Sequence, residues 1–267
     1  MVITLLVGCS AAPREQSASR ADNRLDAVLW QTTSAEYRVL ARSIYASAQA
    51  QLEQALADPN WTALPSQQDN YQRLAPAVIM DIDETVIDTG GFQSQLVRDQ
   101  ARFSSRPWRE WQERNQPAAV PGALEFIAAA QSRGVKVFFV TNRDHPTEEI
   151  TRRNLAALGL SLPNDIDTVL CRGERPDWSN DKESRRLFIA QSHRVIMMFG
   201  DDLGDFISEF RVSPAKRSAA ALKQKEWGSK WFMLPNPMYG SWEGSLYEFR
   251  ANLSPEEVSR QKFNHLP

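Results

Sequence analysis

The sequence predicts an α/β fold with a doubly wound, mainly parallel sheet, because short apolar runs alternate along the chain with segments of helical spacing. The apolar runs are four to six residues long and contain almost no polar residue, which is typical of parallel strands covered on both faces. They are residues 77–80, 135–140, 168–171, 195–199 and 231–234. The helical segments between them are residues 122–133, 147–158 and 182–192. Strands joined in this way are expected to lie parallel.

A helical segment precedes the sheet. Residues 25–56 contain neither Gly nor Pro and carry apolar side chains such as Val28 and Ile44 at helical spacing. This pattern predicts one or two amphipathic helices within residues 25–57, ended by Asp58-Pro59. We expect residues 25–267 to form a single domain.

Composition excludes several classes of protein. The chain has 267 residues, of which 42% are hydrophobic and 24% charged, enough apolar residues for a sizeable core. Lys and Arg number 31 against 33 Asp and Glu, a net charge of −2, so no nucleic-acid partner is expected. No run of about 18 apolar residues is present to span a membrane.

The N-terminus suggests a lipid anchor. An uncharged apolar run, M-V-I-T-L-L-V-G, ends at Cys9 and resembles the bacterial lipoprotein box, in which the cysteine is lipidated. On this interpretation residues 1–24 are a signal remnant and a flexible tether, and Cys9 attaches the protein to the bacterial cell envelope, at the outer membrane or the periplasmic face. A frayed hydrophobic N-terminus is the alternative. Cys171 lies in an apolar run and is expected in the core, without a disulfide.

Polar and acidic residues follow three of the predicted strands at the point where each strand ends. The segments are Asp81-Ile82-Asp83-Glu84-Thr85, Thr141-Asn142-Arg143 and Gly200-Asp201-Asp202-Leu203-Gly204-Asp205. Because ligands of open α/β sheets bind at the carboxyl ends of the strands, these side chains should meet at one edge. So many carboxylates would repel one another unless a hard divalent cation neutralised them, and Mg²⁺ is the natural candidate. An EF-hand is excluded, since Val86 stands where that loop needs Gly.

These segments, with Lys182 between the second and the third, resemble the four ordered motifs of the haloacid-dehalogenase superfamily. Within it the chain is similar to the acid phosphatases typified by the lipoprotein e 5′-nucleotidases. The similarity runs from about residue 77 to residue 244 and includes the flanks 119–123 and 234–244. The resemblance implies a Mg²⁺-dependent acid phosphatase that hydrolyses phosphate monoesters, in particular 5′-nucleotides or NMN, through an aspartyl-phosphate intermediate.

The resemblance also assigns roles to single residues. Asp81 would be the nucleophile and Asp83 the general acid and base. The metal would be held by the Asp81 carboxylate, the Asp83 backbone carbonyl and Asp201, while Asp205 would orient the metal shell. Asp202 has no assigned role.

The phosphate and the leaving group would contact further residues. Thr141 and Asn142 would donate hydrogen bonds to the phosphoryl group, and Lys182 would neutralise its developing charge. Trp108 belongs to a predicted small helical insertion over the site. By resemblance, Phe92, Trp108 and Tyr239 line the substrate pocket, where a nucleoside base stacks between rings. Family members often carry Tyr where this chain has Phe92.

Two other functions stay open from the sequence. The first is a surface lipoprotein that binds a nucleotide or haem without catalysis. The second is a phosphotransferase of the same fold, which would use the same catalytic residues and pass the phosphoryl group to an alcohol. A homodimer is also open, because the sequence does not set the oligomeric state.

Overall fold

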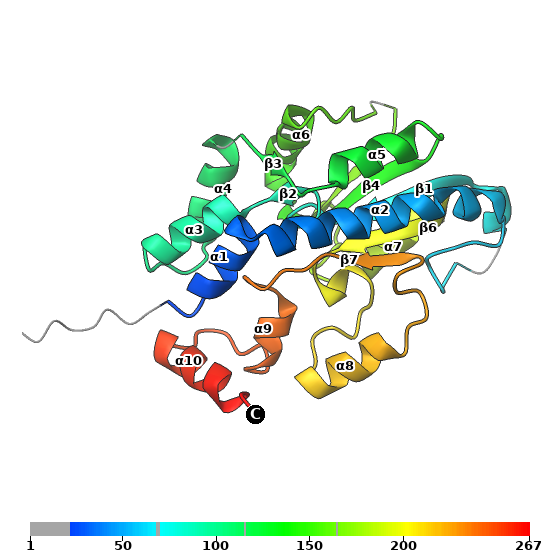
Figure 1. Ribbon diagram of the computed structural model, residues 1–267. Helices are drawn as coiled ribbons and strands as arrows, with labels where there is room; N and C mark the ends of the chain where they lie inside the picture. Colours follow the sequence, from blue (N-terminus) through cyan, green and yellow to red (C-terminus); the bar gives the residue numbers. More distant parts are fainter. Residues whose placement is uncertain (1–21, 68–69, 115, 164) are drawn as a thin grey trace, which may run out of the picture.

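A five-stranded parallel sheet forms the centre of the protein (Figure 1). The computed structural model describes residues 22–67, 70–114, 116–163 and 165–267, so Cys9 and its expected lipidation lie outside the described residues. The strand order is β5-β4-β1-β6-β7, and every neighbouring pair is parallel. The strands are β1 (Ala75–Met80), β4 (Lys136–Asp144), β5 (Val169–Arg172), β6 (His193–Gly200) and β7 (Trp231–Met233). The predicted α/β class and its five strands are confirmed.

Both faces of the sheet are covered, which explains why the strands are almost continuously apolar. Val78 and Met80 of β1 belong to the core on the side of α2 (Ala35–Ala57) and α5 (Ala123–Gln131). Their neighbours Ala77 and Ile79 belong to the core on the opposite side, together with Ile189 of α7 (Glu183–Ala190). Cys171 is fully buried, as expected.

The N-terminal segment forms two helices, α1 (Leu25–Thr33) and α2. Ser34 separates them, because its backbone is extended, at φ −75° and ψ 143°. The Ser34 side chain also accepts a hydrogen bond from the Tyr37 backbone N–H, which caps the start of α2. Helix α2 then packs along α5 over the sheet, as Figure 1 shows.

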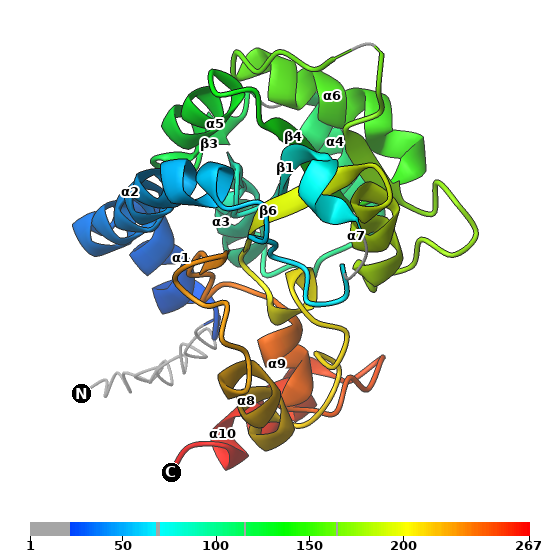
Figure 2. The same cartoon turned by 90° about the vertical axis from the view of Figure 1, so that its right-hand side faces the viewer.

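The remaining elements lie around this sheet or connect its strands. They are β2 (Ile87–Asp88), α3 (Gly90–Arg98), α4 (Ser105–Arg114), β3 (Ala118–Ala119), α6 (Glu148–Ala157), α8 (Pro214–Leu222), α9 (Ser241–Ser245) and α10 (Pro255–Asn264), with short 3-10 turns η1 (Tyr71–Arg73), η2 (His145–Thr147) and η3 (Leu203–Asp205). Helix α4 is the predicted insertion. Figure 2 shows α8, α9 and α10 grouped on one side of the sheet. None of the helices among the described residues is both long and apolar enough to span a bilayer.

Candidate active site

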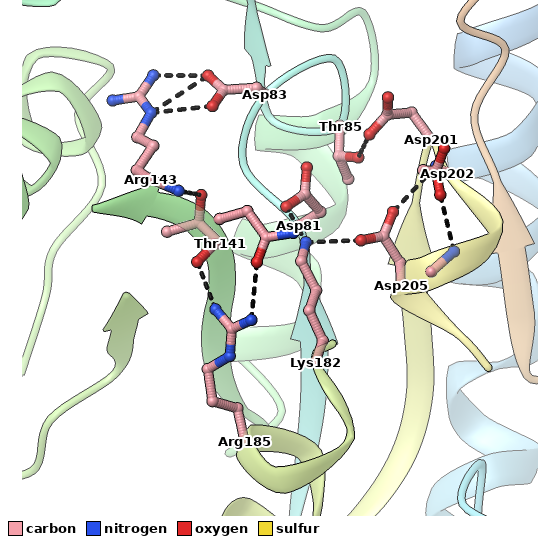
Figure 3. A network of polar contacts seen from close by, with 12 residues as sticks. Asp81, Asp83, Thr85, Thr141, Arg143, Lys182, Arg185, Asp201, Asp202 and Asp205 are labelled. Atoms are coloured by element: carbon pink, nitrogen blue, oxygen red, sulfur yellow. Dashed lines mark hydrogen bonds and ion pairs between the residues drawn. The ribbon is translucent and has the colours of Figure 1, made fainter. Parts of the chain in front are cut away.

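Three carboxylates meet at the carboxyl edge of the sheet (Figure 3). Asp81 follows β1, Asp201 follows β6, and Asp205 lies in η3. Because neighbouring parallel strands end together, one oxygen from each carboxylate lies within 4.8 Å of the others. Asp81 and Asp205 are each only 8% exposed. Together with Lys182, these three residues are called the catalytic floor below.

Lys182 bridges two of these acids. It stands at the N-cap of α7, and its Nζ forms ion pairs with Asp81 and, at 2.6 Å, with Asp205 Oδ1. Burial lowers the pKa of Lys182, but the Asp205 and Asp81 carboxylates outweigh burial and raise the pKa above its usual value. The floor therefore contains a permanent positive charge.

One lysine does not balance three carboxylates. Burial raises the pKa of Asp81 to about 7 against the attraction of Lys182, and the negative charges of Asp205 and Asp83 add to the rise. Burial, followed by repulsion from Asp81, raises the pKa of Asp201 well above its usual range. These closely spaced carboxylates fit a hard divalent cation, because the cation would bind their ionised oxygens and cancel the repulsion between them.

The Asp83 side chain points away from the floor and toward Arg143, as Figure 3 shows. Arg143 Nη2 donates to Asp83 Oδ1 at 2.6 Å, and Arg143 Nε donates to Asp83 Oδ2 at 3.0 Å. Asp83 is therefore not part of the group of side chains that could share an ion, and only its backbone carbonyl was expected to do so.

Thr141 and Asn142 line the cavity above the floor. The buried Thr141 hydroxyl accepts a hydrogen bond from the Arg143 backbone N–H at 3.1 Å. The Asn142 side chain donates to the Asn180 carbonyl at 3.0 Å and accepts from Arg185 Nη2 at 2.7 Å. Arg185 of α7, which sequence analysis left without a role, also donates to the Thr141 carbonyl at 2.5 Å and so fixes the expected phosphate-binding turn.

A cavity of about 960 Å³ opens over the floor. Its lining includes the expected rings Trp108 and Tyr239, as well as Phe103, which is 60% exposed. We call these three side chains the aromatic wall. The cavity continues outward to residues of α10, for which the sequence had suggested no task.

Phe92 lies behind the aromatic wall and not in the lining. It is 1% exposed, and its ring centroid is 4.9 Å from that of Trp108. The Trp111 ring, on the same face of α4, stacks on the Trp108 ring, with the two ring centroids 5.4 Å apart and an interplanar angle of 11°. Phe92, expected to line the pocket, thus supports Trp108 from the core, where a tyrosine hydroxyl would have to be buried.

The loop that carries Tyr239 is held by the two acids after β6. Asn236 Nδ2 donates to Asp201 Oδ2 at 2.8 Å, and Asn236 Oδ1 accepts from the Met238 backbone N–H at 3.0 Å. Asp202 Oδ2 accepts from the Ser241 backbone N–H at 2.6 Å. The unassigned Asp202 therefore fixes the loop behind the aromatic wall.

Glu84 organises the turn that follows Asp83, the second aspartate of the first motif. It is fully buried, with φ at +60°, a conformation that is uncommon for a residue other than glycine. Its carboxylate accepts hydrogen bonds from Gln31 Nε2, from the Thr89 hydroxyl and, at 3.4 Å, from the Tyr239 hydroxyl. The sequence placed Glu84 in the motif, but two of its partners, Gln31 and Tyr239, are distant in the chain and gave no local signal.

Together, the sheet, the acidic strand ends and the cavity define a phosphatase-like site of the haloacid-dehalogenase kind. Residues 10–242 match the model of subfamily IIIB of that superfamily, the acid phosphatases, and the chain belongs to this family.

Solved structures agree with this assignment. The chain is similar to the class C acid phosphatase of Bacillus anthracis, with 30% identity and a TM-score of 0.80 over 92% of this chain and 98% of that one. The tungstate-bound form of that enzyme gives 29% identity and a TM-score of 0.81, over 93% of this chain and 98% of that one.

A stem 28 kDa glycoprotein of Glycine max is 22% identical over 60% of this chain, and the match spans 58% of the soybean protein.

Proposed function

We propose that this acid phosphatase is Mg²⁺-dependent and removes the phosphate from 5′-nucleotides or NMN. The observation that carries the proposal is the catalytic floor, where oxygens of Asp81, Asp201 and Asp205 lie within 4.8 Å of one another beside the Lys182 ammonium. A phosphate monoester needs an in-line nucleophile and neutralised charge, and the floor offers both.

In the first step an Asp81 carboxylate oxygen attacks the phosphorus, and the bond from phosphorus to the leaving oxygen breaks. Asp83 gives its proton to that oxygen, which leaves as an alcohol. Thr141 and Asn142 would hold the phosphoryl oxygens, while Lys182 would offset their negative charge.

In the second step Asp83 takes a proton from a water molecule. The water oxygen attacks the phosphorus, the bond to Asp81 breaks, and inorganic phosphate leaves. Asp81, the Asp83 backbone carbonyl and Asp201 would hold Mg²⁺, with Asp205 orienting the shell. When bound, the ion supplies charge neutralisation between the nucleophile and the substrate.

The aromatic wall supports a nucleoside leaving group. Trp108 and Tyr239 lie in the lining of the cavity that contains the floor, and stacking of a base on one such ring contributes about 1–3 kcal/mol. The Bacillus anthracis enzyme has been solved with tungstate, a tetrahedral oxyanion like phosphate, which supports an oxyanion site in this fold.

Phosphate release tests the proposal. Purified protein should release phosphate from AMP and NMN in Mg²⁺ and lose this activity in EDTA. Asp81→Asn should abolish turnover, whereas the exposed control Asp26→Asn should retain it. Full activity of folded Asp81→Asn would overturn the mechanism, and nucleotide binding without phosphate release would favour the binding lipoprotein. A phosphorylated alcohol formed in added glycerol or nucleoside would reveal a phosphotransferase.

We also propose that Cys9 carries the lipid anchor and places the enzyme in the cell envelope. The support is the apolar run that ends at this cysteine. Membrane fractionation of the full chain expressed in a bacterium, beside Cys9→Ser, provides the test. The wild-type chain should sediment with membranes and incorporate labelled fatty acid, and Cys9→Ser should do neither. An equal distribution of the two would contradict the anchor.

A further inference from the structure

Arg143 is a buried cation, and each of its three side-chain nitrogens donates to a specific partner. Its side chain is 1% exposed. Nε and Nη2 reach the two Asp83 oxygens, while Nη1 donates to Asn154 Oδ1 at 3.0 Å and to Thr151 Oγ1 at 3.4 Å. A buried guanidinium is tolerated only when it is paired and its donors are satisfied, so this geometry is closely constrained.

The same guanidinium contacts the helix that supplies the aromatic wall. Its central carbon lies 5.4 Å from the Trp108 ring centroid, within the range of a cation–π contact. With the amide oxygen of Gln112 oriented toward both donors, Gln112 accepts from Arg143 Nε at 3.2 Å and from Trp108 Nε1 at 2.9 Å. Arg143 therefore joins β4, the first motif and α4 at one point.

We propose that Arg143 is a positioning residue for the phosphatase reaction: it sets the direction of the Asp83 carboxylate and ties that direction to the place of the Trp108 ring. The proposal rests on the proposed role of Asp83 in proton transfer. The Arg143 guanidinium then fixes both the Trp108 ring, which faces the leaving group, and Asp83, which protonates the leaving oxygen. The distance between ring and acid therefore stays constant from one substrate to the next.

The two-point contact is what makes arginine specific here. A planar guanidinium presents Nε and Nη2 to both oxygens of a carboxylate, whereas a lysine ammonium is a single point charge that fixes no orientation. Arg143→Lys therefore keeps the charge beside Asp83 but removes the constraint on its direction.

Leaving groups of different basicity separate positioning of the acid from general damage. The nitrophenolate of p-nitrophenyl phosphate leaves without a proton, so the first step on this substrate does not need Asp83. Loss of the water's proton to Asp83 is needed in the second step for every substrate. Stopped-flow measurement of nitrophenolate release therefore reports a step that does not need Asp83, and steady-state turnover of AMP reports a reaction that does. Both can be measured in one preparation.

For Arg143→Lys we expect a nitrophenolate burst of full amplitude at the wild-type rate, followed by a steady state about tenfold or more slower. AMP turnover should fall by a similar factor without a rise in KM. Asp83→Asn should show the same pattern, and the double variant should be no slower than the slower single variant, because both changes remove one function. Arg152→Lys, on the neighbouring helix α6 and paired with Glu148, is the matched control and should behave as wild type.

Three results would overturn the proposal. A burst amplitude that falls in proportion to AMP turnover would show loss of folded enzyme. A slowed burst rate would show that Arg143 acts on the nucleophile or the phosphate. Losses that multiply in the double variant would show that Arg143 and Asp83 act independently. Failure of the proposed function is distinct, because the wild-type protein would then release no phosphate from either substrate.

Discussion

The catalytic floor and the aromatic wall are parts of one cavity, yet they are built by different means. The floor consists of charged side chains placed by strand ends, by the turn η3 and by the start of α7, and both Asp81 and Lys182 are almost fully buried. The wall consists of rings on α4 and on loops, and Phe103 is 60% exposed. The floor depends on ionic contacts, and the wall depends on ring packing.

The fold therefore places the reacting groups and the groups that select the substrate on separate elements. Strand ends of a buried parallel sheet cannot move without disturbing the core, so the reacting groups keep their distances. Helix α4 and the loop after β7 are additions at the sheet edge, where changes of sequence alter the leaving group that fits and leave the floor intact. Changes in the floor should therefore affect turnover and stability together, whereas changes in the wall should affect the choice of substrate.

The largest effect is expected from Lys182→Met. Removal of the ammonium leaves Asp81 and Asp205 as buried like charges, and loss of one partner from a buried ion pair typically costs about 3–5 kcal/mol. The free energy of unfolding of the metal-free protein, measured in urea, should fall by that amount, and turnover should fall about 10²- to 10³-fold. Mg²⁺ should restore part of the stability. Lys216→Met, at an exposed position of α8, is the control. An unchanged urea midpoint would contradict the account of the floor.

The next effect is a pH-dependent stabilisation by metal. The pKa of Asp81 in the folded protein is raised to about 7, so its contribution to stability is fully present below about pH 4, the usual value, and is lost as the pH rises through 7. Mg²⁺ binds the ionised form and should raise the Tm by about 5–10 °C at pH 8 and by less than half as much at pH 5.

Calorimetry at the two pH values measures this shift. Asp81→Asn removes the titrating group and should flatten the pH dependence of the metal effect. A metal effect of equal size at pH 5 and pH 8 in the wild-type protein would show that the floor does not bind the ion through Asp81.

A smaller, substrate-specific effect is expected in the wall. Trp108→Leu removes the stacking ring and should raise KM for AMP about tenfold, because stacking contributes about 1–3 kcal/mol. KM for glycerol phosphate, which has no base, should stay within about twofold. Trp30→Leu, on α1 and outside the cavity lining, serves as the control. An equal change in KM for AMP and for glycerol phosphate would contradict the view that the wall selects the substrate separately from the floor.

The smallest effect is expected behind the wall. Asp202→Ala removes the acceptor of the Ser241 backbone N–H and hydroxyl, so the loop that carries Tyr239 should loosen. We expect KM for AMP to rise a few-fold and the free energy of unfolding to fall by about 1–2 kcal/mol. Ser241→Ala should add little to Asp202→Ala in a double-mutant cycle. A fall in kcat with constant KM would assign Asp202 to the floor instead.

Sequence patterns predicted the sheet and the acidic edge because both depend on local features. Unbroken apolar runs such as Val195–Phe199 indicate buried strands, and the topology of parallel strands then places their following residues together. The meeting of Asp81 and Asp201, 120 positions apart, required only that rule.

Such local rules do not predict the direction in which a side chain points. Arg143 belongs to the motif Thr141-Asn142-Arg143, but only the packing of α4 and α6 around it turns its guanidinium toward Asp83. Phe92 was assigned to the pocket by resemblance, and its burial depends on how α3 and α4 pack. Tertiary contacts between distant segments decided both cases.

The hydrogen bonds of Glu84 have a consequence for biosynthesis. Its carboxylate is held by Gln31, near the start of the described chain, and by Tyr239, near its end. A nascent chain that has not yet been extended through Tyr239 lacks that hydroxyl, and the turn after Asp83 is then only partly secured. The order of translation thus completes the reaction centre only after all five strands have been made, and a polypeptide that ends between β7 and Tyr239 should be inactive although its sheet is complete.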